Sequence, residues 1–585
     1  MNRNEIETEL TWDLTSLFKD QNAFDEQYEE AQQLLTKLKS YKTHIADSKE
    51  TFIAFMEDDE TFSRYLDNLY SYAKMMTDVE PSSEQGQENL SKAAMLYQKT
   101  IVATNFVPLE IIAHKEEIEA FLKDEDCKDF IYPMQEIFRT IPHRLDDEKE
   151  AMLAQVSELQ RIPGETYDSL RLEYPSVVVN GKEEFLNDGT YFQFLTNKDA
   201  SIRKQAFENY FGEYKRYQNT FMNLLTGNAK AQAFEARIRH YGSALEASLF
   251  GDGADTTLFY KVLDMANVKH KKPLHEYFAF RKQVLNLEEQ HPYDIYLPLV
   301  KNVEKSYSID ESFEILAKAL APLGEEYISL LHKAREERWI DFLPCTGKIG
   351  GAYSGGSHDS KPFILANFNN DYESLSTLAH ELGHSMHSYF SRRANRPLLS
   401  GYKIFVAEVA STVNEILLNK YLLATSDDKD YKATLLNNLL TQLVGTLYRQ
   451  PMYAKFECKL HEMIEHEEAV SSQTLTQIYY DLNVDYFGDS VEVDELQRYG
   501  CYYIPHFYYN FYVYKYTLGM SVALSFVKKI LAGDTKDYLK FLSKGGSEAP
   551  IDELIHAGVD PREDGVYDDA FTFFKETLDE LKTIL

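Results

Sequence analysis

The sequence predicts a mostly α-helical protein that carries a small β-sheet. Apolar residues recur at helical spacing in residues 20–130 and again from about residue 195 onward, whereas strand-like runs are few and short. With 585 residues, the chain is long enough for a large core and for more than one domain. These observations favour a large helical fold built in two parts.

The N-terminal part consists of acidic amphipathic segments followed by a predicted hairpin. Residues 176–186 contain Asn180-Gly181 between two short segments, which is typical of a β-hairpin turn. Helical spacing then resumes, and the first long helix of the second part opens with Arg203. We therefore predict a boundary near residues 190–200, with an N-terminal helical region at 1–195 and a catalytic domain at 196–585.

A short strand followed by a long helix is predicted in the middle of the second part. Residues 363–368 are apolar and strand-like, and Asn370 with Glu373 resembles an N-terminal capping box. The pattern predicts that one helix begins directly after Asn370. Apolar residues recur along it at helical spacing, at Leu375, Leu378, Ala379, Leu382, Met386 and Tyr389.

This helix carries His380, Glu381 and His384 in the pattern H-E-x-x-H. Histidines four residues apart lie on the same helix face, and two neutral imidazoles so placed can bind one Zn²⁺. A glutamate beside the first histidine can take a proton from a zinc-activated water, which then attacks a peptide carbonyl. The motif therefore predicts one Zn²⁺ per chain and hydrolysis of peptide bonds, with Glu381 as general base. The alternative is a helix with two histidines in ordinary surface or core positions.

A catalytic zinc needs a third protein ligand and an open position for water. His387 lies on roughly the same face, but it is about 10 Å from His380 along a straight helix, too far for one metal to reach all three rings. His387 is therefore the weaker alternative. Glu408 is the stronger candidate, because it lies between apolar neighbours in a second predicted helix. Glu415, two turns further, is either a hydrogen-bond partner of a ligand histidine or a surface charge.

Glycines flank a short segment before the predicted strand. Gly351, Ala352, Tyr353 and Gly355 lie in this segment, and glycine permits close approach of the backbone to a ligand. The neighbouring strand at 363–368 is a candidate to pair with an extended peptide through main-chain hydrogen bonds. We therefore predict that the four residues bind substrate. The alternative is an ordinary turn before an edge strand.

Eight tyrosines lie within residues 499–516, together with His506. Tyr509, Tyr512 and Tyr516 follow His506 at spacings that place them on roughly one stripe of a helix. A phenol O–H or an imidazole N–H can stabilise the oxyanion formed when a peptide carbonyl is attacked. We predict that His506 and Tyr512, and then Tyr509 and Tyr516, serve the reaction. The alternative is an aromatic core helix.

The composition excludes several classes of partner. The formal net charge of −33 repels nucleic acid and anionic membrane surfaces. No apolar run approaches the ~20 residues of a membrane-spanning helix, and residues 1–7 lack the basic and then apolar pattern of a secretion signal. The four cysteines are scattered, with no C-x-x-C pair. We therefore expect a cytoplasmic protein without structural disulfides.

Several motifs resemble the oligoendopeptidase F family, whose members are related to thimet oligopeptidase among the zinc metallopeptidases. The resemblance rests first on H-E-L-G-H-S-M-H and on F-V-A-E-V-A-S-T-V-N-E, which begin at His380 and Phe405. The family's N-terminal signature, glycine-rich segment and C-terminal tyrosine-rich motif resemble residues 10–14, 351–356 and 505–514. The resemblance therefore spans nearly the whole chain.

The resemblance implies a cytosolic, mostly helical endopeptidase that cuts short peptides rather than folded proteins. It implies zinc ligands at His380, His384 and Glu408 and a general base at Glu381. In thimet-type relatives a histidine and tyrosines of the C-terminal segment bind substrate, although the spacing from His506 to the tyrosines differs here. The resemblance also implies two helical lobes that wall a deep substrate channel. The expected state is a monomer or small homo-oligomer, and the rival function is a catalytically inactive peptide-binding protein on the same scaffold.

Overall fold

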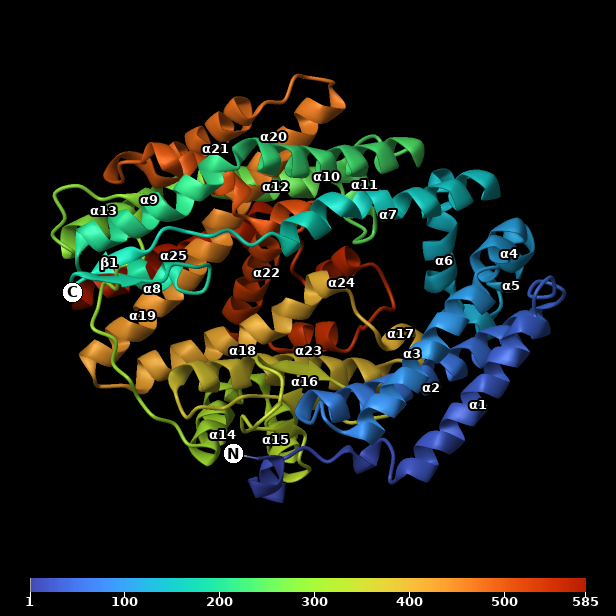
Figure 1. Cartoon of the computed structure of the whole chain (residues 1–585). Helices are drawn as coiled ribbons and strands as arrows, with labels where there is room; N and C mark the ends of the chain where they lie inside the picture. Colours follow the sequence, from blue (N-terminus) through green and yellow to red (C-terminus); the bar gives the residue numbers. More distant parts are fainter. Residues whose placement is uncertain (1) are drawn as a thin grey trace. The chain divides into compact units, whose positions relative to one another are not determined.

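The computed structural model describes residues 2–585 and confirms the predicted mostly helical fold (Figure 1). The chain divides into two compact units, each assembled from three separate segments. The first unit extends to Pro142 and adds Glu304–Leu422 and Phe526–Val559, and the second contains His143–Val303, Leu423–Ser525 and Asp560–Leu585. The boundary predicted near residue 195 would instead divide the chain into two consecutive parts. This boundary stays a prediction.

The first unit holds the N-terminal helices, the three-stranded sheet and the helix with the H-E-x-x-H motif. Its strands are β3 (Ile340–Asp341), β4 (Tyr353–Gly355) and β5 (Phe363–Leu365). Its helices are α1 (Gln21–Ser40), α2 (Lys49–Val79), α3 (Glu84–Thr104), α4 (Val107–Ala113), α5 (Lys115–Phe121), α6 (Ile131–Arg139), α14 (Ile309–Ala319), α15 (Glu325–Glu336), α16 (Tyr372–Ala394), α17 (Pro397–Ser400), most of α18 (Ile404–Thr425), α23 (Lys536–Leu542) and α24 (Pro550–His556).

The second unit holds the two-stranded hairpin and the C-terminal tyrosine cluster. Across both units, within residues 2–585, no helix has both the length and the apolar character needed to cross a lipid bilayer. The strands of the second unit are β1 (Val177–Val179) and β2 (Lys182–Glu184). Its helices are α7 (Asp147–Ser169), α8 (Tyr191–Leu195), α9 (Ala200–Arg216), α10 (Gln218–Ile238), α11 (Ala244–Phe250), α12 (Thr256–Asp264), α13 (Lys271–Val284), α19 (Lys429–Leu443), α20 (Gln450–Glu465), α21 (Ser472–Phe487), most of α22 (Tyr514–Leu531) and α25 (Asp564–Ile584).

Capping side chains explain where the first long helices begin. Ser48 Oγ accepts a hydrogen bond from the Thr51 backbone N–H (3.1 Å) at the start of α2, and Asp20 caps α1 in the same way. Each of α1, α2 and α3 then buries one face, which confirms the predicted amphipathic helices in this part of the chain. Their common core includes Phe24, Leu35, Phe52, Phe55, Leu69 and Leu96.

Asn180 and Gly181 form the turn of the predicted hairpin. β1 and β2 are antiparallel, with Val179 opposite Lys182, and the two turn residues have φ values of 51° and 78°. Such a tight turn needs left-handed conformations, which Asn and Gly adopt at low cost. The hairpin prediction is therefore confirmed.

The sheet of the first unit has the strand order β3–β5–β4. β5 pairs in parallel with β3 and antiparallel with β4, where Ser354 lies opposite Ile364. Both sides of β5 are therefore occupied, and the predicted pairing of the strand at 363–368 with a peptide is wrong. β3 and β4 are the two edge strands, and each has one side without a strand partner in this sheet.

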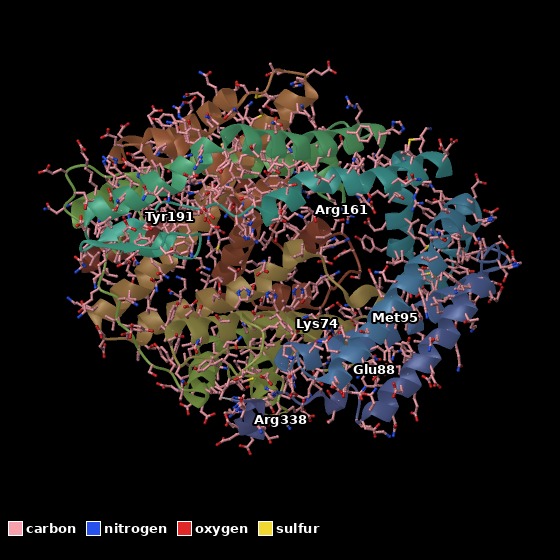
Figure 2. The ribbon with its side chains drawn as sticks, viewed as in Figure 1. Lys74, Glu88, Met95, Arg161, Tyr191 and Arg338 are labelled. Carbon is pink, nitrogen blue, oxygen red and sulfur yellow. The ribbon has the colours of Figure 1, made fainter. Side chains whose placement is uncertain are left out.

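The N-terminal signature packs against this sheet. Trp12 is buried, and the centroid of its ring lies 6.1 Å from that of Phe363 and 6.5 Å from that of Tyr353. Arg338, labelled in Figure 2, donates from Nε to the Thr11 carbonyl oxygen (3.0 Å). The signature is thus an anchor for the central and edge strands of the sheet.

Candidate metal centre

The H-E-x-x-H motif lies on α16, as the sequence predicts. The helix is capped one residue later than expected, because the Asp371 side chain accepts a hydrogen bond from the Ser374 N–H (2.8 Å). Asn370 has a φ of 59°, whereas an N-cap residue normally has an extended backbone. The predicted capping box at Asn370 is therefore wrong, although the helix itself is confirmed.

Three candidate ligand atoms converge at one point of the first unit. His380 Nε2 lies 3.2 Å from His384 Nε2, and Glu408 Oε2 lies 3.4 Å and 3.6 Å from these two atoms. A tetrahedral zinc with bonds near 2.1 Å has ligand atoms about 3.4 Å apart. The three atoms therefore have the spacing of one face of a tetrahedral site, with a fourth position for water or substrate. Two imidazoles and one carboxylate are a donor set typical of catalytic rather than structural zinc.

Gly383 allows α18 to approach α16 closely enough to bring Glu408 to the histidines. A Cβ atom at position 383 would lie 2.6 Å from the Ala410 carbonyl oxygen and 2.7 Å from Ser411 Cα. These are backbone atoms, so no side-chain rotation relieves the clash. The packing of α18 on α16 therefore requires glycine here, although glycine weakens the interior of a helix.

Hydrogen bonds fix the two helices and the ring of the first candidate ligand. The fully buried Asn414 donates from Nδ2 to the Ala379 carbonyl oxygen (3.0 Å) and accepts from the Tyr327 hydroxyl (2.9 Å). Glu415 Oε1 lies 3.1 Å from His380 Nδ1, which turns Nε2 of that ring toward the other ligand atoms. Of the two interpretations of Glu415, the structure supports the hydrogen-bond partner.

The two candidate ligand histidines have opposite pKa shifts. Burial lowers the pKa of His380, but the hydrogen bond with Glu415 and the nearby carboxylates raise it to about 9 overall. Burial and the charge of His380 lower the pKa of His384 to about 4. One positive charge is therefore held on His380. Its proton must leave when a metal binds, because only a neutral imidazole nitrogen is a ligand.

Glu381 is buried next to the edge strand. It accepts a hydrogen bond from the Ser354 backbone, and burial raises its pKa to about 7 against the opposing charge of His380. Ser354 Oγ and Ser385 Oγ lie 2.8 Å apart and make a further contact between β4 and α16. The edge strand and the predicted general base therefore lie side by side.

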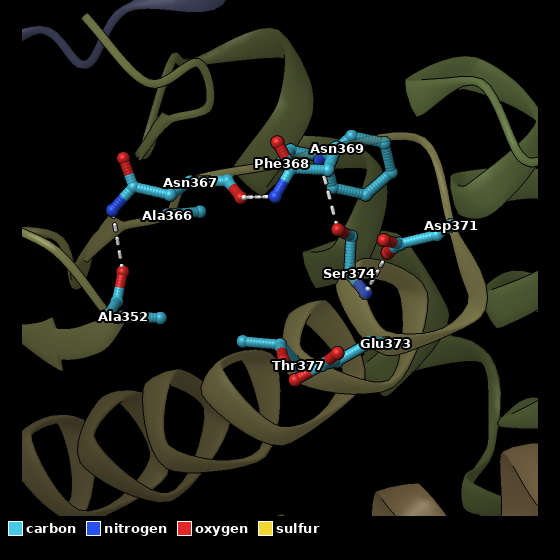
Figure 3. A pocket seen from close by; sticks show the side chains of 10 residues that line it. Ala352, Ala366, Asn367, Phe368, Asn369, Asp371, Glu373, Ser374 and Thr377 are labelled. Carbon is cyan, nitrogen blue, oxygen red and sulfur yellow. Dashed lines mark hydrogen bonds between the residues drawn. The ribbon is translucent and has the colours of Figure 1, made fainter. Parts of the chain in front are cut away.

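The glycine-rich segment leads into the edge strand. Gly351 has a φ of 81°, a left-handed conformation that favours glycine. Gly351 and Ala352 line a cavity of about 310 Å³ between this segment and the first turns of α16 (Figure 3). Tyr353 and Gly355 are not among the residues that line it, and the Tyr353 hydroxyl instead donates to Asp78 Oδ2 (2.8 Å). The Tyr353 side chain thus joins β4 to α2. Only the main chain of Tyr353 is then available to contact a ligand.

His387, the weaker candidate ligand, is not part of the converging group. Its ring is buried and stacks on Tyr402 with centroids 3.7 Å apart, and burial lowers its pKa to about 3. In the described part of the chain, one other group of metal-type side chains converges, at Glu289, His291 and Glu492. Both of its glutamates are exposed, and exposed acidic groups commonly lie close together without a metal ion.

The helical stripe predicted after His506 is wrong, because a 3₁₀ turn and an irregular segment precede α22. The predicted side chains nevertheless gather. The ring of His506 lies 5.6 Å from that of Tyr509, 6.5 Å from that of Tyr512 and 6.1 Å from that of Tyr516. Burial lowers the pKa of His506. These residues belong to the second unit and the candidate ligands to the first, and the predicted catalytic roles of the cluster stay predictions.

Sequence reasoning missed three residues that support the centre: Gly383, Ser411 and Asn414. Ser411 Oγ donates to Glu408 Oε2 (2.9 Å) and so helps to orient the carboxylate. The available signal was spacing, because Ser411 and Asn414 follow Glu408 at steps of three residues on one helix. For Gly383, the signal was a glycine in the interior of a predicted helix.

These features define a class of protein, a helical protein with an H-E-x-x-H centre, whose motif is typical of metallopeptidases. The family model described as peptidase family M3 matches residues 193–573, and the model described as oligopeptidase F matches residues 111–173. The chain is 36% identical to oligopeptidase PepF of Bacillus subtilis (strain 168), over 100% of this chain and 88% of that protein. It is 34% identical to group B oligopeptidase PepB of Streptococcus agalactiae, over 100% of this chain and 98% of that protein.

Solved structures agree with this relationship. Oligoendopeptidase-F from Enterococcus faecium is 30% identical with a TM-score of 0.72, over 96% of this chain and 98% of that chain. A protein of Chlamydophila abortus assigned as a peptidase is 30% identical with a TM-score of 0.94, over 100% of both chains. The chain therefore belongs to peptidase family M3 and, within it, to the oligoendopeptidase F family. The resemblance found in its motifs is confirmed.

Proposed function

We propose that this peptidase is a zinc-dependent endopeptidase that cuts internal bonds of short, unstructured peptides in the cytoplasm. The observation that carries the proposal is the triangle of His380 Nε2, His384 Nε2 and Glu408 Oε2, with sides of 3.2, 3.4 and 3.6 Å. Relatives named as oligopeptidases and oligoendopeptidases support oligopeptide substrates. The donor set suits Zn²⁺, and Mn²⁺ or Co²⁺ accept the same ligands.

In this proposal the ligand residues and Glu381 have separate tasks. Bound zinc supplies Lewis acidity, which brings the pKa of water toward 7 and polarises the peptide carbonyl. Glu381 takes the proton of the attacking water and returns it to the leaving amine. The burial of Glu381 supports this role, because a carboxyl group removed from water holds a proton more readily than an exposed one.

We propose that the substrate binds as an extended chain along the edge strand β4. Main-chain pairing makes few demands on substrate side chains, and it therefore accommodates many sequences. Gly351 and Ala352 allow close approach beside their cavity, and Tyr353–Gly355 contribute main-chain groups. The hydrogen bond between the Ser354 backbone and Glu381 supports this location.

We further propose that His506 and Tyr512, assisted by Tyr509 and Tyr516, donate hydrogen bonds to the carbonyl oxygen as it becomes negative. The gathering of the three tyrosine rings around His506 supports this role. The lowered pKa of His506 supports it too, because the neutral ring keeps one N–H to donate. The deep channel implied by the resemblance stays a prediction.

Cleavage of peptides, read by mass spectrometry, tests the proposal. Unstructured peptides of several lengths are incubated with the zinc-loaded protein, with and without a chelator. We expect internal cuts that stop with the chelator, return with Zn²⁺ and fall off as the peptides become long. The Glu381→Gln variant should still bind one zinc per chain, while its turnover falls about 10²- to 10⁴-fold.

Other outcomes would favour other functions. Peptides that bind the folded, zinc-loaded protein but remain uncut would support the peptide-binding rival on the same scaffold. Cuts confined to one end of the peptides would indicate an exopeptidase. Near-normal turnover of Glu381→Gln would contradict the assignment of Glu381 as general base.

A further inference from the structure

A strained turn lies between His506 and Tyr512 in the second unit. Asn510 and Phe511 have φ values of 52° and 56°, and they are the only adjacent non-glycine residues with positive φ within residues 2–585. Left-handed conformations are unfavourable for residues with a side chain, especially a bulky one such as phenylalanine. Such a turn persists only where surrounding contacts hold it, and strain of this kind gathers at functional sites.

Glu457 of α20 makes a contact that holds this turn. Its Oε1 accepts a hydrogen bond from the Phe511 backbone N–H at 2.7 Å, and its side chain is fully buried. In the described structure, its other carboxylate oxygen has no hydrogen-bond partner. Burial raises the pKa of Glu457 to about 8, so the group is mostly neutral at pH 7. Burial of a carboxyl group with one hydrogen bond costs free energy. The bond between Glu457 and the Phe511 N–H differs in this respect from ordinary surface contacts.

Neighbouring side chains enclose the same turn. The buried ring of His461, one helical turn after Glu457, lies 4.6 Å from the ring of Phe511. Ser248 Oγ donates to the Asn510 carbonyl oxygen (2.9 Å). The ring contact acts on the Phe511 side chain, whereas the Ser248 bond holds the carbonyl end of the same Asn510–Phe511 peptide plane whose N–H bonds to Glu457. The bond to Glu457 acts on the Phe511 backbone, whose φ is the strained angle.

The turn determines how Tyr512 lies relative to His506. Tyr512 follows Phe511 directly, and its ring lies 6.5 Å from that of His506 with an interplanar angle of 16°. A return of Phe511 to a negative φ would rotate the chain on one side of the turn against the other. The pairing of the two rings therefore depends on the conformation of a residue between them.

We infer that Glu457 is a positioning residue: its bond to the Phe511 N–H keeps the Asn510–Phe511 turn left-handed and so keeps Tyr512 beside His506. The inference rests on the proposed function, in which His506 and Tyr512 act on the substrate. Glu457 acts through the turn and not on the substrate itself.

Two substitutions separate the hydrogen bond from the volume of the side chain. Glu457→Gln keeps a carbonyl oxygen that accepts the Phe511 N–H, whereas Glu457→Met keeps the length and loses every acceptor oxygen. We expect kcat of Glu457→Met to fall about 10- to 100-fold, as misplaced catalytic groups do, with KM changed less than about threefold. Glu457→Gln should restore kcat to within about threefold of the wild type. If Glu457→Met does not fold, Glu457→Asp replaces it in the test. This variant withdraws the acceptor oxygen by one methylene and should give an intermediate loss of kcat.

Hydrogen–deuterium exchange gives a readout that does not depend on activity. Peptides spanning residues 505–513 should exchange faster in Glu457→Met than in the wild type, and at the wild-type rate in Glu457→Gln. Glu553→Met is the matched control, because Glu553 is another buried glutamate, on α24 of the first unit. It should change neither the exchange of this segment nor kcat.

Each outcome decides one part of the inference. Wild-type exchange and kcat in Glu457→Met would overturn it. Faster exchange with an unchanged kcat would confine Glu457 to a structural role and overturn the positioning role. A wild-type protein that cuts no peptide would overturn the proposed function and with it the catalytic purpose of the turn, while the exchange rates would still decide whether Glu457 holds it.

Discussion

Ser411 Cα lies 2.7 Å from the point where a Cβ atom on Gly383 would stand. At Gly383 the backbone of α18 therefore packs directly on the backbone of α16. This contact allows Glu408 Oε2 to lie 3.4 Å from His380 Nε2. The position of Glu408, the third candidate ligand, thus depends on Gly383. This glycine lies within the motif that supplies the other two candidate ligands, His380 and His384.

Gly383→Ala should separate α16 from α18 at the candidate metal centre. Its methyl group meets backbone atoms, so α18 must shift and carry Glu408 away from the histidines. We expect the free energy of unfolding to fall by about 1–3 kcal/mol and zinc affinity to weaken about 10-fold or more. Thermal unfolding and zinc titration measure the two effects.

Gly212→Ala is the control for that substitution. Gly212 also lies inside a helix, but apart from its chain neighbours and its own helix backbone no heavy atom lies within 4 Å of the point where its Cβ would stand. Alanine there should leave zinc affinity unchanged and raise stability by up to about 1 kcal/mol. Unchanged zinc affinity in Gly383→Ala would contradict the close-approach explanation.

Glu415→Ala should weaken zinc binding without removing a ligand. The carboxylate orients His380 through Nδ1, and loss of such an outer partner typically costs 10- to 100-fold in metal affinity. Glu415→Gln should lose less zinc affinity, because the amide oxygen of glutamine still accepts the His380 Nδ1–H. Competition with a chelator of known affinity measures the change. Glu326→Ala removes an exposed carboxylate paired with Arg393 and should have no effect, and an equal loss in this control would refute the orienting role.

Glu553 should make the protein less stable as the pH rises. Burial, and then repulsion from Glu548, raise its pKa from 4.5 to about 8. Between these values the folded protein holds a proton that the unfolded chain has released. The free energy of unfolding should therefore fall by about 1.4 kcal/mol for each pH unit across this window.

The test of this linkage is the Tm of Glu553→Gln between pH 4 and pH 9. A neutral amide removes the titration, so the variant should gain Tm over the wild type as the pH approaches 8. Below pH 4.5, where Glu553 is protonated in both states, the gain should disappear. Parallel Tm curves for the two proteins would contradict the raised pKa.

Trp12→Ala should loosen the sheet that carries the edge strand. Trp12 is buried against Phe363 of β5 and Tyr353 of β4, and loss of so large a buried side chain costs about 3–5 kcal/mol. We expect a lower Tm and a higher KM for peptides, since β4 loses its support. Trp12→Phe should lower the Tm and raise the KM by smaller amounts. A Tm close to that of the wild type would show that the N-terminal signature does not anchor the sheet.

Local patterns in the sequence were enough to determine the helix of the candidate metal centre. Helical spacing and residue type are properties of one short segment, so α16, the pair His380 and His384, and the neighbouring Glu381 could be predicted without a structure. The hairpin turn at Asn180-Gly181 was equally local. Glu408 required more, because its helix could be predicted but its distance from the histidines could not.

Only the tertiary structure decided the features that join distant segments. β5 is central because Ile364 pairs with both Ile340 and Ser354, and no pattern within residues 363–368 reveals those neighbours. The segment after His506 has helical spacing but an irregular backbone, in which the Phe511 N–H bonds to a side chain 54 positions earlier in the chain. Sequence periodicity records which face of a segment is apolar. Strand order, the need for glycine at an interhelical contact and a left-handed turn depend on which remote atoms lie nearby, and that is settled only when the whole chain packs.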